Sequence, residues 1–471
     1  MPTSDEIDVL LADPMKYFGY SRSKTMGVSR SDLDELQLTG LKRRFEQFRG
    51  RLPMMDKLAD LQNVHAIEQL NDVLPLLFDH ATYKSYPPSL LEKHRYPQLT
   101  AWLAKLTTVD LSKVDVSGCR SIDEWLMTLD RETPLAVCHT SGTSGSMSFL
   151  PWSKAEWRKM LGTFAMMYCD DFGPDSTLPL NIDCVYPFFR SGGLSHTVIN
   201  DAIRDVIAGS EERLHTAYPQ RLSADMMLLA TRRRVAAAKG QLDQLVIDPE
   251  LESRHDEFAA QQRDMPRHVA EFFDAMRTRL AGKRVFMLGT SNLLYTLAQD
   301  GLKRGLRNVF APDSVIITGG GGKGIVLPPD WQDVAKEFLG VSRLHNNYGM
   351  SELMGQYPSC TNGHHHGTPG LIPYILDDDY KPLPRAGNVT GRFAAYDLLM
   401  DTRWGGFVTG DEVTFEWDKP CGCGWTTPYI IGGSIRRFSE KKDDGGEEKL
   451  SCAAAPEAYA EALDFLNTAA A

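Results

Sequence analysis

The chain has 471 residues, of which 42% are hydrophobic and 24% charged, so it is long enough for a large core and has an ordinary globular composition. Its formal net charge of −11 argues against a nucleic-acid-binding protein, because such a protein needs a basic face to meet phosphates. The N-terminus lacks the basic and apolar regions of a signal peptide, and no run of about 18 apolar residues occurs, so we expect a cytoplasmic protein without a membrane span.

The pattern of apolar residues divides the chain into four regions. Residues 1–130 form a helical region, in which apolar residues recur at three- and four-residue spacing. In residues 131–386, short apolar runs alternate with helical segments, which predicts an α/β core with mostly parallel sheets. The expected strands are 134–138, 182–186, 284–288 and 314–318. Residues 387–432 predict a small β-rich subdomain, and residues 433–471 a charged hinge and a truncated tail.

A loop of small residues directly follows the first expected strand. It consists of Thr140, Ser141, Gly142, Thr143, Ser144 and Gly145. The hydroxyls donate hydrogen bonds without bulk, and the glycines let the backbone approach an anion closely. Because a strand leading into such a loop presents successive N–H groups, we expect it to bind phosphate; the alternative is a flexible Ser/Gly linker. The loop is not that of a P-loop NTPase, since no Gly-Lys-Ser/Thr follows at the required spacing.

Four segments in this order resemble the motifs of the adenylate-forming superfamily, which comprises acyl-CoA synthetases, adenylation domains and luciferases. After the phosphate loop come a strand with a glycine turn at 316–324, the segment 348–352 and the segment 406–412. The resemblance implies a large N-terminal adenylate-forming domain that uses ATP and Mg²⁺. Only a few dozen residues follow Gly432, so the C-terminal domain usual in the superfamily, with its catalytic lysine, is expected to be nearly absent.

The resemblance also implies roles for individual residues. Tyr348 flanks the adenine, Ser351 contacts phosphate, and Glu352 holds Mg²⁺ against the ATP phosphates, as an oxygen ligand suits this ion. Asp411 accepts hydrogen bonds from the ribose hydroxyls, and Arg403 is expected to contact a phosphate or the ribose. The remaining expected nucleotide contacts are Gly320, Gly321 and Gly349, with Lys323 as a cation that neutralises charge during catalysis.

Thiols and imidazoles gather in two further segments, 360–366 and 421–424. Thiolates together with an imidazole suit a tetrahedral structural Zn²⁺. The expected ligands are Cys360, His365, Cys421 and Cys423, with His364 or His366 as replacements for His365. The second segment resembles the metal knuckle of phenylacetate–CoA ligase-like enzymes. The alternative is free thiols with exposed histidines.

The short tail carries one cysteine, Cys452. The motifs and this tail together resemble acyl-protein synthetases, the component of the bacterial bioluminescence fatty-acid reductase that makes an acyl-AMP and then an enzyme thioester. In that family a cysteine near the C-terminus accepts the acyl group, which implies that Cys452 is the acceptor; the alternative is a cysteine that packs the tail down. The hinge arginine is expected to be Arg436 or Arg437, and Lys323, Arg436 or a lysine of the tail is expected to substitute for the missing catalytic lysine.

The predicted reaction begins with attack of a substrate carboxylate on the α-phosphorus of MgATP and release of pyrophosphate. The acyl group then passes to a thiol, which is Cys452, CoA or a carrier protein, and a reductase or acyltransferase is a further expected partner. The expected acyl pocket, which suits a fatty or an aromatic acid, is lined by Tyr186, Phe188, Phe189, Gly289 and Asn292. The alternatives are an acyl-CoA or acyl-carrier-protein ligase and a non-catalytic nucleotide- or acyl-binding module.

Overall fold

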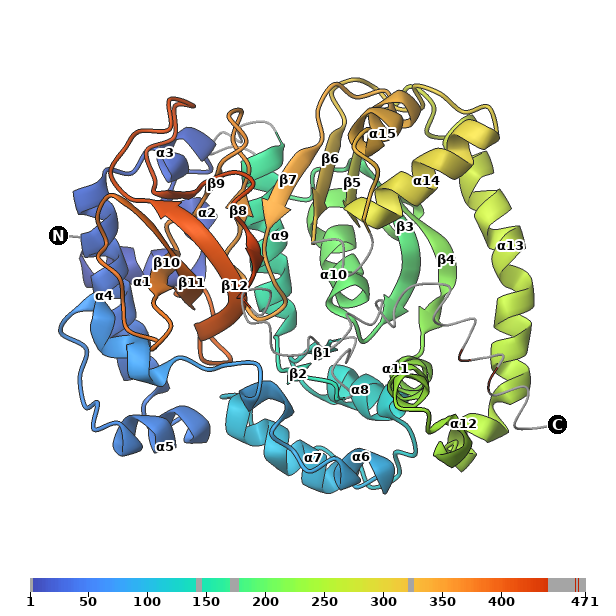
Figure 1. Ribbon diagram of the computed structural model, residues 1–471, viewed down its shortest axis with the longest axis horizontal. Helices are drawn as coiled ribbons and strands as arrows, with labels where there is room; N and C mark the ends of the chain where they lie inside the picture. Colours follow the sequence, from blue (N-terminus) through green and yellow to red (C-terminus); the bar gives the residue numbers. More distant parts are fainter. Residues whose placement is uncertain are drawn as a thin grey trace.

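A six-stranded sheet, in which five neighbouring strands run parallel, forms the centre of one half of the molecule (Figure 1). The computed structural model describes residues 3–140, 146–169, 178–320 and 326–438, and positions 462 and 465. The strand order is β4 (Leu214–Leu222), β3 (Asp183–Gly192), β5 (Val285–Thr290), β6 (Val315–Gly319), β7 (His345–Tyr348) and the antiparallel β8 (Tyr357–Pro358). In register, Thr290 lies beside Gly319 and Gly319 beside Asn347, so the carboxyl ends of β5, β6 and β7 meet at one edge.

The expected strands lie close to the observed ones. Strands β3, β5 and β6 confirm the predictions at 182–186, 284–288 and 314–318, although β3 continues to Gly192. The expected strand 134–138 is shorter in the structure, where only β1 (Cys138–His139) pairs with β2 (Phe149–Leu150). The hairpin made by β1 and β2 therefore carries the small-residue loop between its two strands.

Helices cover both faces of the parallel sheet. Met287 and Ile316 pack in one apolar cluster with residues of α13 (His255–Thr278), α14 (Ser291–Lys303) and α15 (Trp331–Leu339). The neighbouring Phe286 and Ile317 instead belong to the larger cluster, together with residues of α9 (Lys154–Tyr168) and α10 (Ser195–Ile203). This alternation is expected, because successive side chains of a strand point to opposite faces. The central strands are thus buried on both sides, which explains why β3, β5 and β6 are mostly apolar runs, whereas β4 and β7 are more polar.

A second sheet, which is antiparallel, lies on the left of Figure 1. Its order is β10 (Leu371–Leu376), β11 (Asn388–Asp397), β12 (Gly406–Glu416), β13 (Tyr429–Ile430) and β9 (His365–His366), and β14 (Arg436–Arg437) pairs with the side of β12. Strands β9 and β10 come from residues before 387, so the sheet is larger than the one expected within 387–432.

The first part of the chain is mostly helical, and the helices within residues 4–48 lie beside this second sheet in Figure 1. Its helices are α1 (Ser4–Ala12), α2 (Pro14–Tyr17), α3 (Arg22–Met26), α4 (Arg30–Phe48), α5 (Pro53–Leu61), α6 (Ser89–Glu92), α7 (Tyr96–Leu103) and α8 (Ile122–Glu132), and α11 (Ala224–Ala238) and α12 (Pro249–Ser253) follow later. On α4, the amide of Gln37 donates hydrogen bonds to the carbonyls of Pro369 and Leu371, at 3.2 and 3.1 Å. Among the described helices, none has the length and apolar character needed to cross a bilayer.

Candidate functional site

Tyr348 and Asp411 meet where the two sheets face each other. Tyr348 is the last residue of β7, and its hydroxyl donates a hydrogen bond of 2.9 Å to Asp411 Oδ2 on β12. Burial, followed by the nearby Asp411 carboxylate, raises the pKa of the Tyr348 phenol well above its usual range, so the phenol keeps its proton and acts as the donor. The structure therefore brings together two residues that the sequence placed in separate motifs.

Glu352 lies close to this pair, although its side chain is only 7% exposed. Its Oε1 lies 3.3 Å from Nδ1 of His80. A Cβ built on Gly410, the residue before Asp411, would lie 3.9 Å from the other ring nitrogen of His80. His80 therefore lies between the Glu352 carboxylate and the part of β12 that carries Asp411. His80 reaches this place because Phe78 pairs with β12, accepting a hydrogen bond of 2.8 Å from the Val408 N–H.

The base of the small-residue loop is attached to the same region. Thr140 and Ser148 close the loop, since the Thr140 N–H donates to the Ser148 carbonyl and the Ser148 N–H to Thr140 Oγ1, each at 3.1 Å. After β2, the indole of Trp152 donates a hydrogen bond of 2.9 Å to the carbonyl of Ser351. The hydroxyl of Ser351 in turn donates to Ser195 Oγ, at the start of α10, at 3.0 Å. The loop base, residues 351–352 and Asp411 are thus parts of one region.

Several predicted residues lie outside the part of the chain that the structure describes. They are Ser141, Gly142, Thr143, Ser144, Gly145, Gly321, Lys323 and Cys452. Gly320 is described, and it directly follows β6 with a φ of +70°, a conformation that favours glycine. A larger residue would not fit at the neighbouring position, Gly319, because an added Cβ would lie 2.4 Å from the carbonyl oxygen of Asn347.

Two predicted arginines have other partners. Arg403 is fully buried, and it donates hydrogen bonds to the hydroxyl of Tyr83 at 2.9 Å and to the carbonyl of Glu352 at 2.7 Å. The prediction that Arg403 touches a phosphate or the ribose is therefore corrected, because the guanidinium is enclosed by protein. Arg436 is held by Glu412, at 2.7 Å, whereas Arg437 lies 3.8 Å from Asp411. Of the two hinge arginines, the structure thus places Arg437, rather than the predicted Arg436, beside Asp411.

The residues predicted for the acyl pocket lie on the neighbouring strands β3 and β5. Tyr186, Phe188 and Phe189 are at most 4% exposed, and Gly289 faces Pro187 across the strand pair. Asn292 follows in the first turn of α14. The hydroxyl of Tyr186 is buried without a hydrogen-bond partner in the described part of the chain, and burial raises its pKa above the usual range. The three aromatic side chains are therefore buried in the apolar core, and their role in an acyl pocket stays a prediction.

Four side chains gather where β9 meets the turn before β13. The candidate ligand atoms of Cys360, His366, Cys421 and Cys423 all lie within 4.8 Å of one another. Nδ1 of His366 lies 2.9 Å from the carbonyl of Thr427, an arrangement in which Nδ1 donates and Nε2 is left to face a metal ion. His366 therefore takes the place predicted for His365, whose Nδ1 instead lies 3.1 Å from the carbonyl of Tyr357. Three thiols and one imidazole fit a tetrahedral metal ion.

Comparison with known proteins adds a fold-level likeness. No protein-family model matches the sequence, and no curated protein matches it. Among solved structures, 2-hydroxyisobutyryl-CoA ligase in complex with 2-HIB-AMP and CoA, in its thioesterification state, aligns with a TM-score of 0.50 and 13% identity over 88% of this chain and 70% of that chain. An open conformation of that ligase aligns with a TM-score of 0.49 and 12% identity, over 86% and 70%.

A more distant match is apo MatB from Rhodopseudomonas palustris, with a TM-score of 0.33 and 15% identity over 63% of this chain and 48% of that chain. The likeness to 2-hydroxyisobutyryl-CoA ligase covers 88% of this chain, and at such low identity it is a likeness of fold. The two sheets, the parallel order of the first and the motif residues at their junction agree with it. The chain therefore has the fold of that ligase, in agreement with the α/β fold class predicted from the sequence.

Proposed function

We propose that this protein activates a carboxylic acid with ATP, forming an acyl-adenylate and pyrophosphate, and then transfers the acyl group to a thiol. The observation that carries the proposal is the hydrogen bond of 2.9 Å between Tyr348 and Asp411, with Glu352 held next to them by His80. Two motifs that are far apart in the sequence, at 348–352 and 406–412, thus supply an aromatic ring and two carboxylates to one region. A nucleotide needs these groups for its base, its ribose and its metal ion.

In the first step, the oxygen of the substrate carboxylate attacks the α-phosphorus, and the bond to the pyrophosphate oxygen breaks. Asp411 accepts hydrogen bonds from the ribose hydroxyls, Tyr348 lies along the adenine, and the loop that begins at Thr140 surrounds the phosphates. Glu352 is the ligand that would hold Mg²⁺, an ion that neutralises charge on the phosphates. The contribution of the protein is mainly positioning, which brings the two reacting groups together without further loss of freedom.

In the second step, a thiolate attacks the acyl carbonyl and AMP leaves. The acceptor is Cys452, CoA or a carrier protein. Cys452 suits an acyl-protein synthetase with a partner reductase or acyltransferase. CoA is the ligand in both structures of 2-hydroxyisobutyryl-CoA ligase with which the chain aligns, and that observation favours a CoA ligase as the second candidate.

The cluster of Cys360, His366, Cys421 and Cys423 holds a structural Zn²⁺ in this proposal. All four positions are protein ligands, whereas a catalytic zinc keeps one position open for water or substrate. The cluster joins the segment before β9 to the turn between β12 and β13. The zinc would therefore stabilise the sheet that carries Asp411 and take no part in the reaction.

The proposal is tested by exchange of labelled pyrophosphate into ATP, with a panel of fatty and aromatic acids. We expect exchange that requires an acid and Mg²⁺, and that falls at least about a hundredfold in Glu352→Gln, because a metal ligand is lost. Absence of exchange with every acid, despite binding of ATP, would instead support a non-catalytic nucleotide-binding module. Acyl-CoA formation that is unchanged in Cys452→Ala would select the CoA ligase over the acyl-protein synthetase.

A further inference from the structure

Two residues of one loop form hydrogen bonds with the backbone of the segment that carries Glu352. The loop is residues 397–403, which connect β11 to β12. At its start, Asp397 Oδ2 accepts hydrogen bonds from the N–H groups of Met354 and Gly355, both at 2.6 Å. At its end, Arg403 donates to the carbonyl of Glu352 at 2.7 Å. The Glu352 carbonyl and the N–H groups two and three positions after it are therefore tied to the same loop.

The side chains of Asp397 and Arg403 are both buried and are held by further contacts. Asp397 is 0% exposed, and its other oxygen accepts a hydrogen bond of 3.0 Å from the N–H of Leu399, within the loop. Arg403 is also 0% exposed, and its guanidinium lies over the rings of Tyr83 and Trp152, 5.6 and 5.0 Å from their centres. A buried charge without partners is costly, so both groups favour the one arrangement in which their hydrogen bonds are made.

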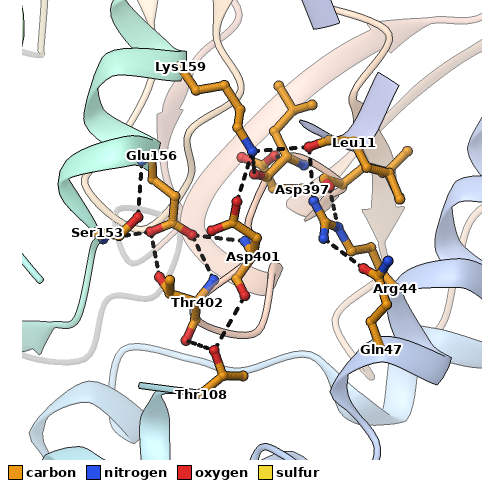
Figure 2. Close-up of polar contacts among 12 residues, drawn as sticks. Leu11, Arg44, Gln47, Thr108, Ser153, Glu156, Lys159, Asp397, Asp401 and Thr402 are labelled. Atoms are coloured by element: carbon orange, nitrogen blue, oxygen red, sulfur yellow. Dashed lines mark hydrogen bonds and ion pairs between the residues drawn. The ribbon is translucent and has the colours of Figure 1, made fainter. Parts of the chain in front are cut away.

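The loop is itself fixed by a polar network that reaches the N-terminal helices (Figure 2). The ammonium of Lys159, on α9, contacts the carbonyls of Leu11 and Leu399 at 3.0 Å each and the Asp401 carboxylate at 3.1 Å. Arg44, on α4, donates to the carbonyl of Leu398 at 2.7 Å and also to that of Leu11 at 3.1 Å. Figure 2 shows the two cations meeting at the Leu11 carbonyl, the point where α1 ends.

A carboxylate holds the other side of the loop. Glu156, also on α9, is 0% exposed, and its Oε1 accepts hydrogen bonds from the N–H groups of Asp401 and Thr402, at 2.9 and 3.0 Å (Figure 2). Its Oε2 accepts from the Thr402 hydroxyl at 2.6 Å and from the N–H of Ser153 at 2.8 Å. Helix α9 thus begins at Ser153, just after the hairpin of the phosphate loop, and presents both a carboxylate and a cation to the loop.

We infer that Asp397 and Arg403 are positioning residues, which set the place of the Glu352 carboxylate for the ATP-bound Mg²⁺ through the backbone of residues 352–355. The inference rests on the proposed function, because it takes Glu352 as the Mg²⁺ ligand. It gives the N-terminal helices a role in the site, since α1 and α4 hold the loop that holds Glu352. Neither Asp397 nor Arg403 needs to touch the nucleotide or the ion.

The test is the substitution Asp397→Asn. An amide has one acceptor oxygen, so it cannot serve the three N–H groups that the carboxylate serves, and residues 352–355 lose their fixed place. The affinity for ATP is measured by calorimetry with saturating Mg²⁺ and again in EDTA. We expect the affinity in Mg²⁺ to fall about tenfold or more, as is usual when the support of a metal ligand is removed, and the affinity in EDTA to change little. The Mg²⁺ concentration for half-maximal pyrophosphate exchange should rise by a similar factor.

The matched control is Asp72→Asn. Asp72 Oδ2 also accepts two consecutive backbone N–H groups, of Glu68 and Gln69, at 2.7 and 2.8 Å, but it lies in the N-terminal region away from residues 352–355. If Asp397→Asn does not fold, Arg403→Lys is the second variant, because lysine keeps a cation between Tyr83 and Trp152 but lacks the planar fork that reaches both Tyr83 and Glu352.

The possible results separate the two proposals. A purely structural role for Asp397 would lower the melting temperature and leave the ratio of the two affinities at its wild-type value, which would overturn the inference. Absence of acid-dependent exchange in the wild-type protein would overturn the proposed reaction, while the two calorimetric affinities would still decide whether Asp397 supports the metal ligand. Absence of any ATP binding by the wild-type protein would overturn both.

Discussion

Asp411 is the residue on which nucleotide affinity depends most in this account. It receives one hydrogen bond from Tyr348 and lies 3.8 Å from Arg437, and it has a second oxygen that can accept from a ribose hydroxyl. The substitution Asp411→Asn removes the charge, and a hydrogen bond to a charged group contributes about 1.5–3 kcal/mol. We expect the Kd for ATP to rise by about ten- to a hundredfold, measured by calorimetry. Asp418→Asn, just beyond the end of β12, is the control, and an unchanged Kd in Asp411→Asn would contradict the ribose assignment.

The two hinge arginines can be distinguished at the same scale. Arg436 is paired with the buried Glu412, whereas Arg437 lies beside Asp411 and is 59% exposed. We expect Arg437→Met to slow pyrophosphate exchange at least about tenfold, because a cation near the nucleotide is lost. Arg436→Met should keep near-normal exchange and lower the melting temperature, since it removes the ion pair of 2.7 Å with the buried Glu412. The opposite order of the two rates would restore the assignment made from the sequence.

At the scale of elements, an aspartate in each of the helices α8 and α11 caps the N-terminus of the other helix. Asp225 accepts hydrogen bonds from the N–H groups of Ile122 and Asp123, at 2.9 and 3.1 Å, at the start of α8. Asp123 in turn accepts from the N–H of Ala224 and, at 2.6 Å, from the hydroxyl of Ser223, at the start of α11. Burial, and then repulsion by Asp123, raises the pKa of Asp225 to about 8. The folded pair therefore holds a proton that the unfolded chain releases near pH 3.8.

This pair predicts a pH dependence of stability. Because the folded state binds the extra proton, the contribution of the pair to the free energy of unfolding falls as the pH rises from about 4 to about 8, by at most about 1.4 kcal/mol per pH unit. Burial lowers the pKa of His139 to about 4, so the contribution of this residue to the free energy of unfolding rises with pH. The slope of stability against pH is therefore compared between the variant and the wild-type protein. Urea unfolding at several pH values should give a slope that is more positive in Asp225→Asn than in wild type. Equal slopes would contradict the shared proton, and the exposed Asp110→Asn is the control.

The periodicity of the sequence predicts the central elements well, because β3, β5 and β6 are buried apolar runs whose pattern depends on local residues. It fails for the antiparallel sheet before residue 387, where β9 has only two residues, His365 and His366. So short a strand has no periodicity. It exists because β13 pairs with it, and that partner lies more than sixty positions away in the chain.

The cysteine cluster acts at the scale of the whole molecule, because it joins two segments that are distant in the chain. We expect the purified protein to contain about one zinc ion per chain, measured by plasma mass spectrometry. Cys423→Ser should lose the zinc and lower the melting temperature, because a ligand is removed and three others are left without their ion. Cys119→Ser is the control, since that thiol lies outside the cluster, next to Thr128. Full zinc content in Cys423→Ser would contradict the assignment.

The motif residues of the site were predictable, because each motif combines a turn with a residue type that suits one part of a nucleotide. Tyr348, Glu352 and Asp411 are of this kind, and the structure brings them together. The supporting residues were not predictable, since His80 and Asp397 belong to no motif and act only through the tertiary fold. The sequence singled out Arg403 but assigned it to the nucleotide, because the position of an arginine near a motif does not show that its side chain is buried.

The central claim is that the phosphate loop, Glu352 and Asp411 surround one nucleotide. The most direct measurement is a crystal structure of the protein with an acyl-sulfamoyl adenosine, a stable analogue of the acyl-adenylate. The account predicts the ribose hydroxyls within about 3.2 Å of the Asp411 carboxylate, with the adenine against Tyr348 and the sulfamate beside the loop that begins at Thr140. An analogue bound elsewhere, with Asp411 still paired only to Tyr348 and Arg437, would contradict it.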